Sequence, residues 1–219
     1  MDERGTKATF DDLGIPFPLF AAPAEEAIGY LGRSTCSLCD KHDAHCFESP
    51  QDEGTACYDC LRSGRTTISK DTVVGTVGGR LAEQGMTDAV GVSKTRLEEF
   101  GFEVIPHRVE PDAPDWHQVK VPAEYLLELL RTPDYCTYQG SIWLFCCQRP
   151  MVYQGIWKEA QFEKFAGDTD PAQFFNSVMT DIPDCDFVWG KHAPLDGCGG
   201  PYVFKCPSCN TFKGNHDMC

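Results

Sequence analysis

The sequence lacks the features of exported and membrane proteins. Its first ten residues, MDERGTKATF, have mixed charge and no apolar stretch, so we expect no secretory signal. The longest apolar runs, such as residues 15–24, are too short and too rich in proline to span a bilayer. No N-x-[ST] glycosylation acceptor occurs. We therefore expect a cytoplasmic protein with no membrane contact, in a compartment where thiols stay reduced.

Motifs of common enzyme sites are missing as well. The chain contains neither H-E-x-x-H nor G-x-S-x-G. The glycine-rich stretch VGTVGGR, residues 74–80, has neither the Gly-Lys-[Ser/Thr] end of a P-loop nor the spacing of G-x-G-x-x-G. We therefore expect a protein that is not an enzyme.

Positive charge is scarce along the whole chain. The 33 acidic residues outnumber the 19 basic residues, which gives a formal net charge of -14. Residues 1–66 carry 12 acids and 6 bases, residues 67–120 carry 9 and 6, and residues 121–219 carry 12 and 7. Binding to phosphates needs clustered Lys and Arg, so direct contact with nucleic acid is not expected. The acidity suits either solubility or attraction of a basic partner.

The residue pattern predicts an α+β fold in a single domain, residues 1–219, with short antiparallel strands and several helices. Helices are expected at 121–131, within 155–166 and at 170–179, and a buried strand at 141–147. Residues 66–118 differ in texture because they combine glycine-rich and loop-like tracts. We expect this segment to form an insertion or a small lobe.

Cysteine is abundant, with 13 in 219 residues. Cys36 and Cys39 form one C-x2-C pair, Cys57 and Cys60 form another, and 17 residues separate the two pairs. This spacing falls within the usual range of about 15–20 residues for a tetrahedral zinc site built from two turns. We therefore predict that these four cysteines bind zinc and staple the fold.

Other roles for this cysteine-rich stretch are less well supported. A redox C-x-x-C needs a strand-to-helix turn of a βαβ unit, and neither pair has that context. A full set of disulfides is impossible within one chain because 13 is odd. Cys46, His42 and His45 lie between the pairs, but two complete pairs already supply four ligands. Cys46 is expected to be a small buried residue on a strand.

A second metal site is predicted around the late pair Cys206 and Cys209. The nearest candidate partners are Cys146 and Cys147, which are adjacent in SIWLFCCQRP. Neighbouring strand residues face opposite sides, so both reach one ion only if the chain bends. His216 and Cys219 are the alternative ligands. In total we expect about two zinc ions per chain.

Taken together, these motifs resemble the CbrC family of bacterial proteins. That family has two early Cys-x-x-Cys pairs, a proline-led helix ending in TP-x-Y, a Trp-Leu-x-His-Cys strand and a late Phe-x-Cys-x-x-Cys turn. The matching pieces here are the two early pairs, VPAEYLLELLRTPDY, WLFCC and VFKCPSC. Cys146 stands where the family tends to have histidine, and residues 66–118 are longer than the family's middle segment.

The resemblance implies immunity or tolerance to a bacterial toxin. The family's named member is linked to tolerance of a DNase-type colicin, and relatives occur beside toxin genes. The leading hypothesis is therefore a non-enzymatic zinc protein that binds a basic toxin or nuclease domain directly. Two alternatives remain: a zinc-ribbon module acting on nucleic acid or in transcription, and a hydrolase that uses an open second zinc site.

Overall fold

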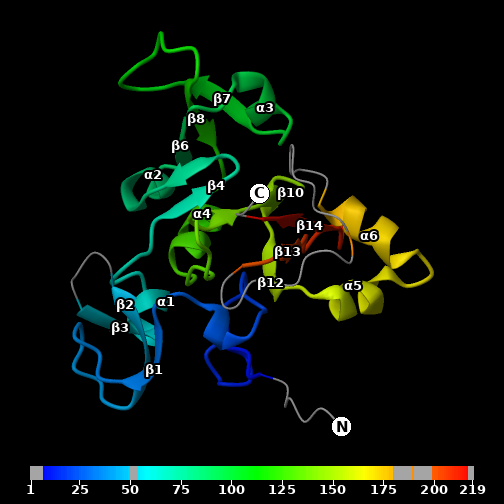
Figure 1. Ribbon diagram of the computed structural model, residues 1–219. Coiled ribbons are helices and arrows are strands. Elements are labelled where there is room, and N and C mark those ends of the chain that lie inside the picture. Colours follow the sequence, from blue (N-terminus) through cyan, green and yellow to red (C-terminus); the bar gives the residue numbers. More distant parts are fainter. Residues whose placement is uncertain (1–6, 50–53, 180–188, 190–198, 217–219) are drawn as a thin grey trace.

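A computed structural model describes residues 7–49, 54–179, 189 and 199–216 of the chain. The fold is α+β, as predicted, with several sheets of mainly antiparallel strands and six α-helices among these residues. Figure 1 shows the N-terminal segment in the lower part of the molecule and a projecting part at the top. No helix in the described ranges is long and apolar enough to cross a membrane.

The first sheet follows the N-terminal segment, which ends in a short 3-10 helix, η1 (Ala24–Glu26). It contains β1 (Tyr30–Ser34), β2 (Ala44–Ser49) and β3 (Gly54–Cys57), all antiparallel. The helix α1 (Tyr58–Arg62) begins directly after β3. The C-terminal end of β3 and the start of α1 therefore lie at one point of the fold.

The largest sheet has six strands in the order β7-β8-β6-β5-β4-β9. These strands are β4 (Lys70–Thr72), β5 (Gly75–Val77), β6 (Met86–Val90), β7 (Glu103–Pro106), β8 (Trp116–Lys120) and β9 (Ile142–Trp143). The helices α2 (Gly79–Glu83), α3 (Lys94–Glu98) and α4 (Ala123–Leu130) belong to this part of the chain. The β4–β9 pairing is parallel, whereas the other pairings between named strands of the described residues are antiparallel. Residues 66–118 thus supply five of the six strands, and β8 ends two residues beyond this segment. The division of the chain into domains stays a prediction.

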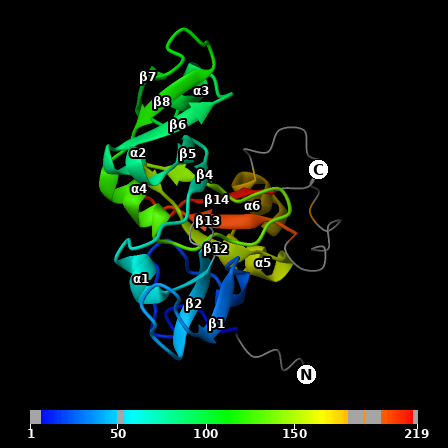
Figure 2. The same ribbon diagram turned by 90° about the vertical axis from the view of Figure 1, so that its left-hand side faces the viewer.

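The C-terminal part forms a hairpin and a third sheet. The hairpin joins β10 (Phe145–Cys146) to β11 (Arg149–Pro150), and the sheet has the order β12-β13-β14. The strands of this sheet are β12 (Val152–Ile156), β13 (Tyr202–Lys205) and β14 (Phe212–Asn215). The helices α5 (Glu159–Ala166) and α6 (Pro171–Val178) pack beside it, as Figure 2 also shows.

The three predicted helices are present at the predicted positions, but the predicted single strand is not formed. Residues 141–147 form two short strands, β9 and β10, rather than one. Trp143 pairs with Thr72 in the six-stranded sheet, whereas Phe145 pairs with Pro150 in the hairpin. The chain changes sheets at Leu144, and the side chains of Trp143, Leu144 and Phe145 are all buried in one core cluster.

One apolar core connects all four sheets. Phe47 from β2, Val119 from β8, Phe145 from β10 and Phe204 from β13 belong to the same buried cluster. The N-terminal segment joins it through Tyr153, whose amide donates to the Leu19 carbonyl at 2.9 Å. This core fixes the loops that carry the cysteines relative to one another.

Candidate metal centres

The first cysteine group lies where two turns converge beside the first sheet. The sulfurs of Cys36, Cys39, Cys57 and Cys60 all lie within 4.8 Å of one another. The Cys36–Cys60 and Cys39–Cys57 sulfur pairs are each 3.8 Å apart. The structure therefore brings together the four residues that the sequence spacing selected.

These sulfur distances match a metal tetrahedron and not a disulfide. A disulfide bond holds its sulfurs at about 2.05 Å. Four sulfurs placed about 2.3 Å from a central zinc ion form a tetrahedron with edges of about 3.8 Å, because the edge is 1.63 times the radius. The observed 3.8 Å separations equal that edge. The group could therefore hold a metal ion.

The first half of this site is a tight turn at Cys36–Cys39. The Asp40 amide donates to the Cys36 carbonyl at 2.9 Å, and the Cys36 amide donates to the Lys41 carbonyl at 2.9 Å. Asp40 has φ of 55°, a left-handed conformation that Asp and Asn tolerate better than most residues. The turn therefore directs both sulfurs to one side of the chain.

The second half lies at the junction of β3 and α1. Cys57 is the last residue of β3 and the N-cap of α1, and Cys60 lies in the first turn of that helix. The Cys57 amide also donates to the Cys36 sulfur at 3.2 Å. Because amide donors stabilise a thiolate, this bond favours the charge state that a metal ion needs.

The predicted bystanders lie outside the group. The Cys46 sulfur is not part of it, and Cys46 is fully buried on β2 opposite Cys57. His42 lies 3.1 Å from the Thr35 hydroxyl, and His45 lies 2.6 Å from the Tyr30 hydroxyl. Nine cysteines of the described residues carry free thiols. Cys136 is disulfide-bonded, which differs from the expectation that the thiols stay reduced.

The second group joins residues that are far apart in the sequence. The sulfurs of Cys146, Cys147, Cys206 and Cys209 lie within 4.8 Å of one another. Cys146 is 3.8 Å from Cys147 and 3.7 Å from Cys209, again close to the tetrahedral edge. His216 does not belong to the group, and Cys219 lies outside the described residues.

A tight hairpin turn allows two adjacent cysteines to share one site. Cys147 and Gln148 have φ of 52° and 58°, and they connect the paired residues Cys146 and Arg149. Two consecutive positive φ values are the mark of a type I′ turn. The required bend therefore lies at Cys147 itself, ahead of Pro150, and it turns both sulfurs toward the late pair.

The late pair repeats the turn of the first site. The Asn210 amide donates to the Cys206 carbonyl at 3.0 Å, and the Cys206 amide donates to the Thr211 carbonyl at 2.8 Å. Asn210 has φ of 62° and occupies the position that Asp40 has in the first turn. Each site thus combines one turn of this type with a second, different turn.

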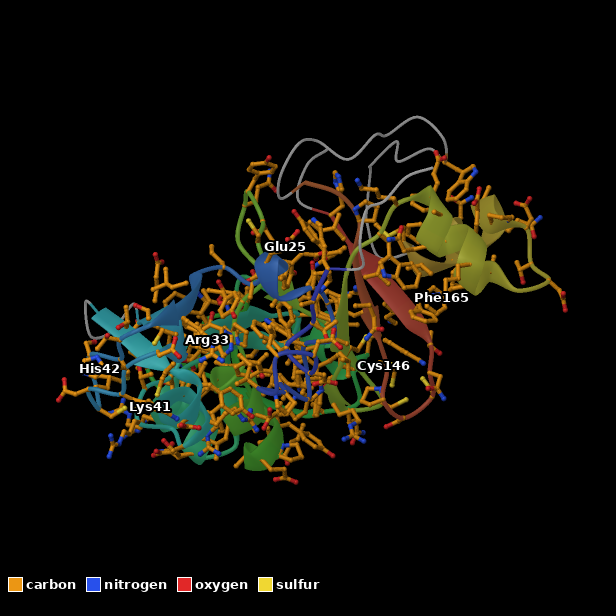
Figure 3. All side chains as sticks on the ribbon, turned by 90° about the horizontal axis from the view of Figure 1, so that it is seen from below. Glu25, Arg33, Lys41, His42, Cys146 and Phe165 are labelled. Carbon is orange, nitrogen blue, oxygen red and sulfur yellow. The ribbon has the colours of Figure 1, made fainter. Side chains whose placement is uncertain are left out.

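The two groups differ in exposure and position. Three cysteines of the first group are buried and Cys39 is exposed, whereas Cys147 and Cys209 of the second group are both exposed. In Figure 3, Lys41 and His42, next to the first group, lie at one end of the molecule, well apart from Cys146. The second group therefore offers its sulfurs to solvent more freely.

The thiols within each group influence one another's protonation. Burial opposes ionisation of Cys36, but amide hydrogen bonds from Cys57 and others lower its pKa to about 7. Burial and the neighbouring thiols raise the pKa of Cys60 to about 12. In the second group, contacts with Thr211 lower the pKa of Cys209 to about 6. Four close thiols cannot all ionise alone, whereas a divalent cation at their centre would favour four thiolates.

Sequence reasoning missed the residues that hold the second group in place. The Gln148 side-chain amide donates to the Gly101 carbonyl at 2.7 Å, which ties the cysteine turn to the segment 66–118. The Arg149 guanidinium donates to the Ser208 hydroxyl at 3.3 Å and lies over the Tyr125 ring. The two hydrogen bonds span 47 and 59 residues of sequence, so no local pattern indicates them.

The arrangement supports two groups that could each hold a metal ion. The ligand role of these eight cysteines stays a prediction, which the positions of their sulfur atoms favour. Four sulfurs fill every position of a tetrahedral ion, as in structural sites, whereas catalytic zinc sites keep one position for water.

Comparison with known proteins gives one match. A family model described as an uncharacterised protein family, UPF0167, matches residues 16–218 and so includes both cysteine groups. No curated protein and no solved structure matches the chain.

Proposed function

The chain belongs to the uncharacterised protein family UPF0167, and we propose that it is a non-enzymatic zinc protein that binds a basic bacterial toxin directly and so gives immunity or tolerance. The proposal that the chain binds zinc rests on the two four-sulfur groups, in which sulfur–sulfur distances of 3.7–3.8 Å are close to the edge of a zinc tetrahedron. The binding role rests on charge and on the resemblance to the CbrC family.

Zinc is the metal that the ligands favour. Four thiolates in a tetrahedron suit zinc or an iron–sulfur centre, and zinc needs no redox partner. We propose about two zinc ions per chain, one in each group. With four thiolates around each dication, each site would add about two negative charges to a chain that already carries a formal charge of -14.

The acidic charge supports a basic protein partner. Opposite fields speed the encounter of two proteins, and nuclease domains present basic clefts to their nucleic acid substrates. The same acidity opposes direct contact between this chain and nucleic acid. We propose that the metal sites act as rigid supports of the binding surface and that the protein works in the cytoplasm.

The resemblance to the CbrC family selects the class of toxin. Its named member is linked to tolerance of a DNase-type colicin, so the proposed target is a nuclease domain of that type. Closed four-thiolate sites support this role over a hydrolase, which would need an open zinc position. The even spread of acidity supports it over a nucleic-acid module.

The test combines cell survival with binding. Bacteria that produce the chain are challenged with a DNase-type colicin, and the purified metal-loaded chain is titrated with the inactivated nuclease domain. We expect protection, a one-to-one complex, and association that slows as salt rises, because the Debye length falls from about 30 Å at 0.01 M to about 8 Å at 0.15 M. Dissociation should change little with salt.

Two results would contradict the proposal. Folded, metal-loaded protein that forms no complex at low salt would exclude direct binding of this toxin. Protection without a complex would show that tolerance arises by another route.

A further inference from the structure

The outer end of the six-stranded sheet has two very different faces. Thr87, Ala89 and Val119 of β6 and β8 are fully buried on the inner face. On the opposite face, Val90 and Trp116 are cross-strand partners at the end of these strands. Figures 1 and 2 show β6, β7 and β8, with the loop that joins β7 to β8, projecting at the top of the molecule. The exposed end of this face is available to a partner.

Apolar side chains gather on this exposed end. Val90 is 52% exposed, Trp116 is 37% exposed, and Val109 in the adjoining loop is 73% exposed. The solvated face of an antiparallel sheet is ordinarily polar. We call Val90, Val109 and Trp116 the tip patch. Grouped apolar side chains on a surface mark interaction sites, and tryptophan is enriched in the centres of protein interfaces.

The loop that carries Val109 is held against the strands. The Val109 and Glu110 amides both donate to the His107 Nδ1 atom at 3.3 Å. The His107 ring packs edge-on against Trp116 with ring centroids 5.2 Å apart, and its Nε2 atom lies 3.4 Å from the Asp88 carboxylate. The tip patch is therefore organised before any partner arrives, which lowers the entropic cost of binding.

Carboxylates predominate in the loop that adjoins the tip patch. Glu110, Asp112 and Asp115 are exposed in the loop between β7 and β8, where Arg108 is the exposed basic residue. An apolar centre with an acidic rim complements a partner with an apolar residue among Lys and Arg side chains. A second copy of this chain, a nucleic acid or an anionic lipid surface would instead place like charges opposite this rim.

We infer that the tip patch and its acidic rim form the surface on which a basic protein docks. This inference rests on the proposed function, since it assigns the toxin-binding role to one part of the chain. Trp116 would supply the central apolar contact, and the rim would guide the encounter and set the orientation.

Charge-reversal variants with a matched control test the rim. Glu110→Lys/Asp112→Lys and Glu163→Lys/Asp168→Lys each change the formal net charge by four, from -14 to -10. Glu163 and Asp168 are exposed on and after α5, which lies far from the tip in Figure 1. The probe is the inactivated nuclease domain of a DNase-type colicin. We expect the first variant to slow association at low salt at least tenfold more than the second.

Single substitutions test the apolar centre. Trp116→Ala should weaken binding by about 30-fold, which corresponds to the 2 kcal/mol threshold of an interface hot spot. Val109→Lys keeps the fold, because Val109 is 73% exposed, and it should also weaken binding. Leu31→Lys, at a residue 44% exposed on β1, is the matched control and should bind like the parent. Melting curves check that each variant is folded.

The outcomes separate the two proposals. If the parent binds and the tip variants bind equally well, the tip inference is wrong and the proposed function stands. If the parent does not bind, the proposed function fails and the inference that depends on it falls as well. Self-association at low salt that Val109→Lys abolishes would assign the tip to a second copy and would overturn the inference.

Discussion

Cys57 and Cys46 provide a matched pair for testing the first metal site. They are partners on adjacent strands, and their exposed fractions are 1% and 0%. The Cys57 sulfur belongs to the four-sulfur group and the Cys46 sulfur does not. We predict that Cys57→Ser releases the metal and unfolds this region, whereas Cys46→Ala is tolerated.

The magnitudes differ because only one of the two thiols is a predicted ligand. Structural zinc contributes about 10–16 kcal/mol of apparent binding free energy, so an equal share for one of four ligands is about 3 kcal/mol. If the ion is released, the loss of stability approaches the whole binding free energy. That amount is comparable to the total stability of a typical domain, about 5–15 kcal/mol. Loss of the buried Cys46 sulfur should cost only about 1–2 kcal/mol.

Elemental analysis and thermal unfolding measure both effects. Cys57→Ser should carry one zinc ion fewer than the parent and should aggregate or lose amide protection in β1, β2, β3 and α1. Cys46→Ala should keep the full metal content and lose about 2–8 °C in melting temperature, at roughly 2–4 °C per kcal/mol for a chain of this size. Equal metal content and equal melting temperatures for Cys57→Ser and the parent would show that Cys57 is not a structural ligand.

Three further predictions concern the second site, a buried carboxyl group and a turn residue. The parent should bind about two zinc ions by elemental analysis and Cys209→Ser about one, and an unchanged value would exclude Cys209 as a ligand. Burial raises the pKa of Glu26 even though hydrogen bonds from Ile156 and Tyr153 oppose the rise, so the folded state holds this proton more tightly than the unfolded state. The free energy of unfolding should therefore fall as pH rises above the ordinary value of 4.5, and Glu26→Gln, compared by urea titration, should lack that fall. Asn210→Ala should lose about 1 kcal/mol because of its φ of 62°, whereas Asn210→Gly should not, and equal losses in urea unfolding would contradict this account.

The first site could be predicted because its chemistry is local. Two C-x2-C pairs 17 residues apart show both ligand type and geometry in the sequence itself. The helices at 123–130 and 171–178 were likewise predictable, since proline and Asp170 mark where they begin. Asp170 accepts a hydrogen bond from the Gln173 amide at 3.0 Å, as an N-cap should.

The second cysteine group and the six-stranded sheet depend on long-range structure. A type I′ turn is ordinarily signalled by Asn-Gly or Asp-Gly, and Cys147-Gln148 carries no such signal. The change of sheet at Leu144 also leaves no mark, because a buried apolar run looks the same whether it serves one strand or two. The sequence of residues 106–116 reads as a loop, and nothing in it indicates that Trp116 pairs with Val90, because that pair forms only when β6 and β8 meet.

The two cysteine turns share a backbone while differing in sequence, so one form of turn serves both groups. Residues 36–41 read CSLCDK and residues 206–211 read CPSCNT, yet both close with the same two amide-to-carbonyl bonds. The positions between the cysteines make different contacts in the two turns, since Ser37 bonds to Thr55 and Ser208 accepts from Arg149, whereas the position after the second cysteine must accept a left-handed backbone in both. Relatives in which that position carries a β-branched residue would need a differently shaped turn, so this single column of the family should discriminate members that keep this architecture from those that have lost it.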